Sequence, residues 1–156
     1  MTEIERKFLV EDTPPDLSSH PSSEIRQGYL AVDSDGTEVR VRGRDDTAVL
    51  TVKQGAGRSR AEVEIEIERE IFERLWPLTD GRRVEKRRYV IPGGDGITIE
   101  VDVYEGALAG LVVAEVEFED DERADAFEPP SWFAREVTDD PRFKNQSLAR
   151  EGKPSA

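Results

Sequence analysis

The feature that most constrains this chain is a regular alternation of charged and apolar residues that recurs along its length. In one segment, Glu62, Glu64 and Glu66 alternate with Val63 and Ile65. Because successive side chains of a β-strand point to opposite sides, such a segment places its charges on one face and its apolar side chains on the other. The pattern predicts eight strands, at about residues 3–10, 25–32, 37–44, 47–53, 60–68, 83–91, 97–104 and 111–119.

The connections between these segments indicate how the strands are arranged. Most are short and contain turn residues, as in the Asp and Gly residues of 33–36 and the Pro and Gly residues of 92–96. Short links favour antiparallel neighbours. One helix is expected from about Glu68 to Trp76, where Pro77 would stop it. The chain is therefore predicted to be mainly β, of the α+β class, with a few short helices.

The charges of the predicted strands are sorted by sign. For any one strand, a solvated outer face over a buried inner face explains the alternation well. Across the set, however, carboxylates occupy the first, fifth, seventh and eighth strands and cation pairs the third and sixth. Solvated faces usually mix signs in cross-strand pairs. An eight-stranded antiparallel closed barrel with a charged interior, wrapped by the helices, accounts for the sorting. We predict this tunnel as a single domain over residues 1–156.

The predicted interior combines carboxylates with Lys and Arg. Clustered carboxylates raise one another's pKa unless a cation compensates them, and Mg²⁺ and Mn²⁺ prefer oxygen ligands. Arg and Lys in turn suit phosphate groups. The combination favours a metal-dependent phosphoryl site. Its carboxylates are Glu3, Glu5, Glu62, Glu64, Glu100, Asp102, Glu115 and Glu117, and its cations are Lys7, Arg40, Arg42, Lys53, Lys86 and Arg88.

Composition excludes several other classes of protein. The net charge of −13 disfavours binding to nucleic acid or to anionic membranes. The chain contains no cysteine, which excludes disulfides and zinc–thiolate sites. No apolar run approaches the roughly 20 residues of a membrane helix, and no basic-then-apolar signal region follows Met1. We therefore expect a cytoplasmic protein that acts on a small molecule.

The charged segments also resemble a known family. The opening Glu3-Ile4-Glu5-Arg6-Lys7 is similar to the amino-terminal E-x-E-x-K signature of the CYTH, or triphosphate tunnel metalloenzyme, superfamily. The resemblance is to its short, single-domain bacterial branch and spans nearly the whole chain in order. Further similar segments lie at residues 26–30, 39–42, 51–53, 62–64, 85–89, 100–102, 113–117 and 140–145.

This resemblance implies a role for each charged position. Glu3, Glu5 and Glu117 resemble principal metal ligands, assisted by Glu115, and Mg²⁺ or Mn²⁺ is expected with two ions per tunnel. A second ion or a water would be held by Glu62, Glu64, Glu100 and Asp102. Lys86 is a candidate general base, with a metal-bound hydroxide as the alternative. The phosphates would be bound by Lys7, Arg40, Arg42, Lys53 and Arg88. Apart from the resemblance, we expect Arg60 to line the tunnel mouth, and Lys144 to touch the tunnel if the last helix covers one end.

The function that this predicts is hydrolysis of inorganic tripolyphosphate to pyrophosphate and phosphate. Within the family, hydrolysis of thiamine or nucleoside triphosphates and an adenylate cyclase activity of the class IV type stay open. A non-catalytic polyphosphate- or nucleotide-binding module is the alternative from another class. The apolar outer strand faces also leave a homodimer open. Trp76, Trp132 and three phenylalanines are expected to pack helices against those faces.

Overall fold

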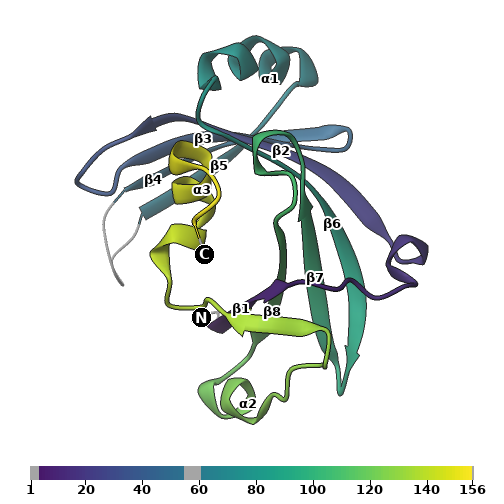
Figure 1. Cartoon of the computed structure of the whole chain (residues 1–156). Coiled ribbons are helices and arrows are strands. Elements are labelled where there is room, and N and C mark those ends of the chain that lie inside the picture. Colours follow the sequence, from purple (N-terminus) through teal and green to yellow (C-terminus); the bar gives the residue numbers. More distant parts are fainter. Residues whose placement is uncertain (1–3, 55–60, 156) are drawn as a thin grey trace. The chain divides into compact units, whose positions relative to one another are not determined.

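The computed structural model describes residues 4–54 and 61–155, which form nine β-strands and a few short helices (Figure 1). The prediction of a mainly β, antiparallel protein is confirmed. The strands are β1 (Ile4–Val10), β2 (Ser22–Val32), β3 (Glu38–Arg44), β4 (Thr47–Gln54), β5 (Ala61–Ile67), β6 (Arg83–Gly94), β7 (Ile97–Tyr104), β8 (Val112–Phe118) and β9 (Phe133–Glu136). The α-helices are α1 (Arg69–Leu75), α2 (Asp121–Ala126) and α3 (Asn145–Glu151), and single 3₁₀ turns occupy Leu17–Ser19, Trp76–Thr79, Gly106–Leu108 and Pro141–Phe143.

The chain divides into two compact units. The first comprises Met1–Ser23 and Lys86–Phe143, and the second comprises Glu24–Glu85 and Lys144–Ala156. In the first unit β7, β8, β1 and β9 are hydrogen-bonded neighbours in that order, and in the second β5, β4, β3 and β2 are. Within each unit the strand pairs are antiparallel. The predicted single domain over residues 1–156 stays a prediction.

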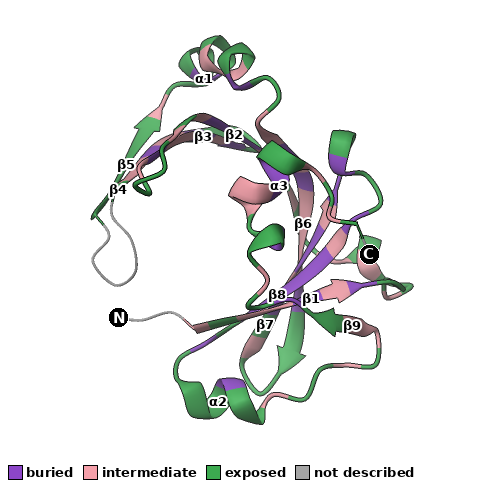
Figure 2. Cartoon of the chain, turned by 60° about the vertical axis from the view of Figure 1, so that its left-hand side comes forward, coloured by how far each residue is buried: buried purple, intermediate pink, exposed green. Residues whose placement is uncertain are grey.

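The core of the first unit lies on the apolar faces of β7, β8 and β1. Val101 and Val116 are completely buried there (Figure 2). Helix α2 contributes Ala124 to this core, and the segment after it adds aromatic side chains. Phe8 packs on Phe133 with their ring centroids 4.9 Å apart. Trp132 contributes to the same cluster, as predicted. The other charged residues of these strands are on the opposite face, but Arg6 of β1 lies on the core side, where its guanidinium stacks on the Phe8 ring.

The core of the second unit lies between helix α1 and the strands β3 and β4. Phe72 of α1 is fully buried against Val41 and Ala48. A Cβ atom at Gly43 would lie 2.9 Å from the Phe72 ring, closer than ordinary van der Waals contact. Glycine at this position is therefore what lets the helix approach the sheet. Trp76 packs against the same cluster, which confirms its predicted structural role.

The prediction of an eight-stranded closed barrel is wrong on two points. The structure has a ninth strand, β9, and the sheet of the described residues is open, with β5 at one end of the strand order and β9 at the other. Strand β9 pairs antiparallel with β1, and the backbone N–H of Val137 donates to the carbonyl of Lys7 at 2.8 Å. The outer edge of β1 is therefore already occupied, which leaves no edge there for β5. Strand β5 is solvent-exposed along nearly all of its length (Figure 2).

No helix within residues 4–54 and 61–155 has the length and apolar character that crossing a bilayer requires.

Candidate functional site

The charged face of the first unit is built around Asp102 of β7. This carboxylate is completely buried and accepts three hydrogen bonds. Lys86 Nζ donates to Oδ2 at 2.8 Å, and Arg88 donates from Nε to Oδ1 at 2.8 Å and from Nη2 to Oδ2 at 3.0 Å. The antiparallel register places Arg88 of β6 directly opposite Asp102. Asp102 is thus the buried anchor that orients the Arg88 guanidinium.

Burial and charge pull the pKa values of this cluster in opposite directions. Burial raises the pKa of Asp102, but the charge of Lys86 and the hydrogen bond from Arg88 outweigh it and hold that pKa at about 2. Burial lowers the pKa of Lys86, which is only 1% exposed, against the favourable field of Asp102. The pKa of Arg88 is raised, because its bonds to Asp102 outweigh the effect of burial. Asp102 and Arg88 are therefore both ionised at neutral pH.

Two further carboxylates extend the cluster. Arg88 Nη1 lies 2.9 Å from Glu100 Oε2, and Arg88 Nη2 lies 3.8 Å from Glu115 Oε2. Glu115 also lies 3.4 Å from Lys7 Nζ, and Lys7 Nζ donates to the carbonyl of Phe143 at 3.3 Å. Cross-strand register accounts for these contacts, because Lys7 and Glu100 both lie opposite Glu115. Lys7, Arg88, Glu100 and Glu115 therefore share one surface with Asp102.

Glu5 and Glu117 lie at the less compensated end of that surface. They face each other across β1 and β8. Burial, followed by the negative charge of Glu115, raises the pKa of Glu5 to about 7, with a further contribution from Glu117. Lys7 and Arg88 oppose this rise without cancelling it. Glu5 is nevertheless exposed on one side, so solvent weakens this interaction. Around Glu5, the effects of burial and of the neighbouring carboxylates on its pKa therefore exceed those of Lys7 and Arg88.

These carboxylates fit a hard divalent cation by the type of donor that they offer. Mg²⁺ and Mn²⁺ bind carboxylate oxygens, and a carboxylate with a raised pKa signals charge that a cation would compensate. Among the described residues, no three acidic or histidine side chains already converge in a metal-binding arrangement. Glu3, a predicted ligand, lies outside the described residues.

The predicted cations of the second unit lie in cross-strand rows. Arg40 of β3 pairs with Thr51 of β4, which pairs with Glu64 of β5. One row over, Lys53 lies between Glu38 and Glu62. Glu62 and Glu64 are exposed on β5, whereas Glu38 is largely buried. Lys53 therefore has a carboxylate directly on each side, whereas Thr51 separates Arg40 from the nearest carboxylate of β5 in its row.

Arg40 is held by its own strand and leaves one donor unsatisfied. Its Nη1 lies 3.3 Å from Glu38 Oε2, and Glu38 Oε1 accepts a weak 3.4 Å hydrogen bond from Gln146 of α3. Arg40 Nε is buried and has no hydrogen-bond partner within the described part of the chain. An unpaired buried donor costs about 1–3 kcal/mol, so an oxyanion that reached Nε would recover that cost.

Sequence reasoning did not single out Gln27. This residue of β2 lies opposite Arg42, is only 1% exposed, and accepts a hydrogen bond from Arg42 Nε at 2.6 Å. Its amide nitrogen donates to the hydroxyl of Tyr29 at 2.7 Å. Burial, with the charge of Glu38, raises the pKa of Tyr29, so its hydroxyl is protonated at neutral pH. Gln27 is uncharged, so a search for charged residues along the strands does not find it. Its two-residue spacing from Tyr29 nevertheless places both on the face of the sheet that carries Arg40 and Arg42.

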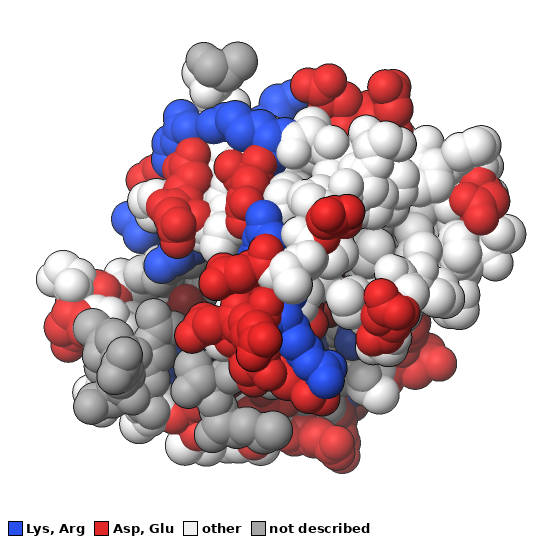
Figure 3. Space-filling model, turned by 90° about the horizontal axis from the view of Figure 1, so that it is seen from below, with Lys and Arg blue, Asp and Glu red and all other residues white. Residues whose placement is uncertain are grey.

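Lys144 and Arg60 are the remaining predicted basic residues. Lys144 is an exposed residue at the start of α3, where its carbonyl accepts from the Leu148 N–H. Arg60 lies outside the described residues. Asp and Glu side chains form several groups on the face shown in Figure 3, and Lys and Arg lie beside some of them.

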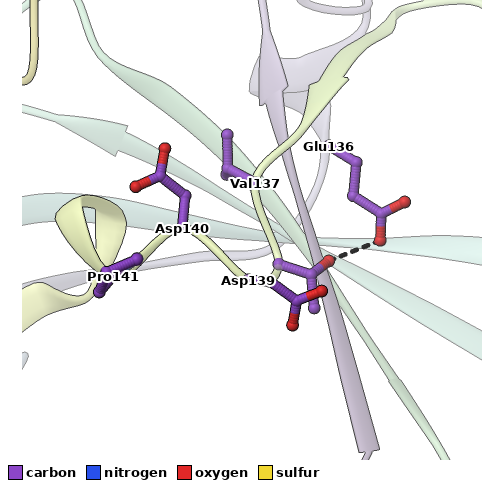
Figure 4. A pocket seen from close by; sticks show the side chains of 6 residues that line it. Glu136, Val137, Asp139, Asp140 and Pro141 are labelled. Carbon is purple, nitrogen blue, oxygen red and sulfur yellow. Dashed lines mark hydrogen bonds between the residues drawn. The ribbon is translucent and has the colours of Figure 1, made fainter.

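Two pockets help to separate the candidate site from the rest of the surface. In the first unit, residues 136–141 line an open hollow of about 520 Å³ (Figure 4). Its carboxylates are already engaged, because Glu136 accepts hydrogen bonds from Arg6 and the Thr138 hydroxyl, and Asp140 accepts one from Arg142. In the second unit, Arg42 lines a pocket of about 160 Å³ with Arg44, Thr47, Ala48, Val49 and Glu64. The smaller pocket is therefore the one that contains predicted site residues.

Comparisons with known proteins show which proteins this chain resembles. The family model of the CYTH domain matches residues 1–149. A relative from Nitrosomonas europaea named inorganic triphosphatase is 50% identical over 149 residues, which cover 96% of this chain and 97% of the relative. A relative of the same name from Acetivibrio thermocellus is 42% identical over 154 residues, covering 95% and 93%. The crystal structure of an inorganic triphosphatase matches with a TM-score of 0.83 at 45% identity, covering 96% of this chain and 95% of that one.

Proposed function

The chain belongs to the CYTH domain family, and from that premise we propose that it is a metal-dependent hydrolase that converts inorganic tripolyphosphate to pyrophosphate and phosphate. The observation that carries the proposal is the 50% identity over almost the full length to a protein named inorganic triphosphatase. The charged faces of both units support it, because they supply cations for a polyanion and carboxylates for a metal. The pockets lined by residues 136–141, by Arg26 and its neighbours, and by Arg42 and its neighbours all have mainly charged and polar linings, which suits an ionic ligand.

The basic residues are assigned to the phosphates. Arg40 and Arg42 offer guanidinium donors that match phosphate oxygens in a bidentate geometry, and Lys53 and Lys7 supply point charges. Arg88 reaches the surface from a buried anchor, because Asp102 holds its Nε and Nη2. A guanidinium that is already oriented loses less conformational freedom when it binds an anion. These residues would bind and orient the triphosphate chain.

The metal is assigned to the carboxylates of the first unit. Glu5, Glu115 and Glu117 would hold it, with Glu3 as a fourth candidate ligand. A bound Mg²⁺ or Mn²⁺ would neutralise negative charge on the phosphate oxygens and lower the pKa of a coordinated water. Asp102 and Glu100, predicted as ligands of a second ion, are engaged by Arg88. Their proposed role in the apo protein is therefore to fix Arg88.

Lys86 is a candidate general base, with a metal-bound hydroxide as the alternative, and its surroundings favour another role. Its ammonium group is buried, bonded to Asp102 at 2.8 Å, and 5.4 Å from the centre of the Tyr104 ring. Burial lowers its pKa, as a general base requires, but its contact with Asp102 directs its proton away from solvent. We propose that Lys86 first of all positions Asp102, and its role as the base stays a prediction. The choice of metal, two ions per site, a cytoplasmic location and a homodimer also stay predictions.

Phosphate release from three substrates tests the proposal. Tripolyphosphate, ATP and thiamine triphosphate are each supplied with Mg²⁺, with Mn²⁺ and with EDTA. We expect release from tripolyphosphate to exceed that from the other two and to stop in EDTA. Faster turnover of ATP or thiamine triphosphate would show that the organic triphosphate, and not tripolyphosphate, is the preferred substrate. Phosphate release in the presence of EDTA would contradict the proposed metal dependence. If none of the three substrates released phosphate, a binding module or a cyclase would be favoured.

A further inference from the structure

Gln27 occupies an unusual position for an uncharged polar residue. It lies in the middle of β2, and only 1% of it is exposed. Its neighbours on the same face are charged or polar, because the register pairs Gln27 with Arg42 and Tyr29 with Arg40. Both ends of its amide are used, at 2.6 Å to Arg42 and 2.7 Å to Tyr29. Two short hydrogen bonds in a buried location define its conformation closely.

The chemistry of the partners fixes the direction of both bonds. A guanidinium group has donors only, so the atom of Gln27 that faces Arg42 Nε must be the carbonyl oxygen. The amide NH₂ then faces Tyr29, whose hydroxyl oxygen must accept. Tyr29 is itself only 1% exposed and cannot move away without leaving the interior. Two hydrogen bonds therefore link the buried Tyr29, through the buried Gln27, to the guanidinium of Arg42.

These linked hydrogen bonds restrain the part of the Arg42 side chain that sets the direction of its guanidinium plane. Nε is the atom that joins the aliphatic stem to the planar fork, so a bond at Nε fixes rotation of the plane. Arg42 also lines the 160 Å³ pocket together with Arg44 and Glu64. An arginine side chain carries about 2 kcal/mol of rotamer entropy when it is unrestrained. Restraint before binding removes part of that loss from the binding step.

We propose that Gln27 is a positioning residue for substrate binding, which holds the Arg42 guanidinium in the orientation that receives a phosphate group of the substrate. The inference rests on the proposed triphosphatase function. It extends that function to a residue that touches neither phosphate nor metal and acts through Arg42 alone.

Substitution of Gln27 separates positioning from packing. Gln27→Met keeps the length of the side chain and its apolar contacts but removes both hydrogen bonds. Gln27→Asn keeps the amide but is one methylene shorter, so it cannot span Arg42 and Tyr29 together. We expect each variant to weaken tripolyphosphate binding about three- to tenfold, which is the range for ordering one flexible side chain. We also expect KM with Mg²⁺ to rise by the same factor, with kcat changed less than twofold.

A matched control accounts for the loss of a buried polar group. Thr79 is fully buried in the same unit, and its hydroxyl donates to the carbonyl of Trp76. Thr79→Val should lower the free energy of unfolding while leaving KM and the dissociation constant for tripolyphosphate unchanged. If Thr79→Val raises KM as much as Gln27→Met does, the effect belongs to general stability and the proposal is overturned.

A double-mutant cycle with Arg42 gives the decisive result. Tripolyphosphate binding is measured by calorimetry in EDTA, so that turnover does not interfere, for Gln27→Met, Arg42→Ala and the double variant. If Gln27 acts only through Arg42, the double variant binds as weakly as Arg42→Ala does and no weaker. Additive losses, or unchanged binding by Gln27→Met, would overturn the positioning role. Intact binding without phosphate release would instead overturn the proposed function and leave this inference standing.

Discussion

Asp102→Asn is the substitution that should most damage the first unit. The side chain is completely buried and neutralises two cations, one of which, Lys86, is itself only 1% exposed. Asparagine has nearly the same shape but carries no charge and turns an NH₂ group toward one of its cationic partners. Lys86 would then be a buried ammonium group without a counter-ion. The cost therefore comes from an uncompensated buried charge, with little change in packed volume.

The magnitude follows from burial and from the pKa of Asp102. Breaking a buried ion pair by removing one partner costs about 3–5 kcal/mol. The pKa of Asp102 falls from 3.8 to about 2 on folding, which corresponds to about 2 kcal/mol of stability at neutral pH. Because the folded-state pKa is depressed, that contribution is complete above about pH 4 and is lost as the pH falls through 2. The difference between wild type and Asp102→Asn should therefore narrow on acidification.

Urea unfolding at pH 7 and at pH 3 measures both effects, and Lys86→Met provides the matched comparison. Methionine fills a similar volume, and Asp102 keeps its two bonds from Arg88. We expect Lys86→Met to cost less than Asp102→Asn does, because the Arg88 guanidinium still compensates the buried Asp102 carboxylate and no buried charge is left without a partner. If Asp102→Asn costs no more than Lys86→Met, or its effect is the same at both pH values, the reasoning from buried charge is refuted.

Three further predictions concern the metal, the phosphates and the fold. Glu5→Gln should abolish metal-dependent turnover. It should also stabilise the protein at pH 8 but not at pH 4, because the pKa of Glu5 is about 7 in the folded state, so the wild type loses stability as the pH rises from 4.5 through 7. Full activity of the variant, or equal unfolding curves of variant and wild type at pH 8, would contradict this. Arg40→Ala should weaken tripolyphosphate binding by about 1.5–3 kcal/mol, or roughly 10- to 150-fold, in calorimetry, and an unchanged affinity would remove Arg40 from the site. Gly43→Ala should cost about 1–3 kcal/mol in urea unfolding because its methyl group meets the Phe72 ring, and Phe72→Leu should recover part of that loss; additive costs would argue against this contact.

The division of each strand into two faces could be predicted from the sequence because it is a local property. Val41 and Gly43 face helix α1, whereas Arg40 and Arg42 lie on the other side, as a period of two requires. The expected helix after β5 was also correct to within a residue at its start. Such features depend only on neighbouring residues.

Long-range pairing could not be predicted in the same way. Strand β9 has four residues and follows two prolines, so its alternation is too short to recognise. It pairs with the edge of β1, from which more than 120 residues of the chain separate it, so no local pattern could reveal it. The role of Asp102 was equally hidden, because sequence shows a carboxylate beside others and cannot show that Lys86 and Arg88 converge on it.

The central claim, that this chain hydrolyses inorganic triphosphate, is tested most directly by ³¹P NMR of tripolyphosphate incubated with the protein and Mg²⁺. The account predicts that the tripolyphosphate resonances disappear while pyrophosphate and orthophosphate accumulate in equal amounts, and that Glu5→Gln and EDTA both prevent the change. An unchanged tripolyphosphate spectrum with the wild-type protein, or equal conversion by Glu5→Gln, would contradict it.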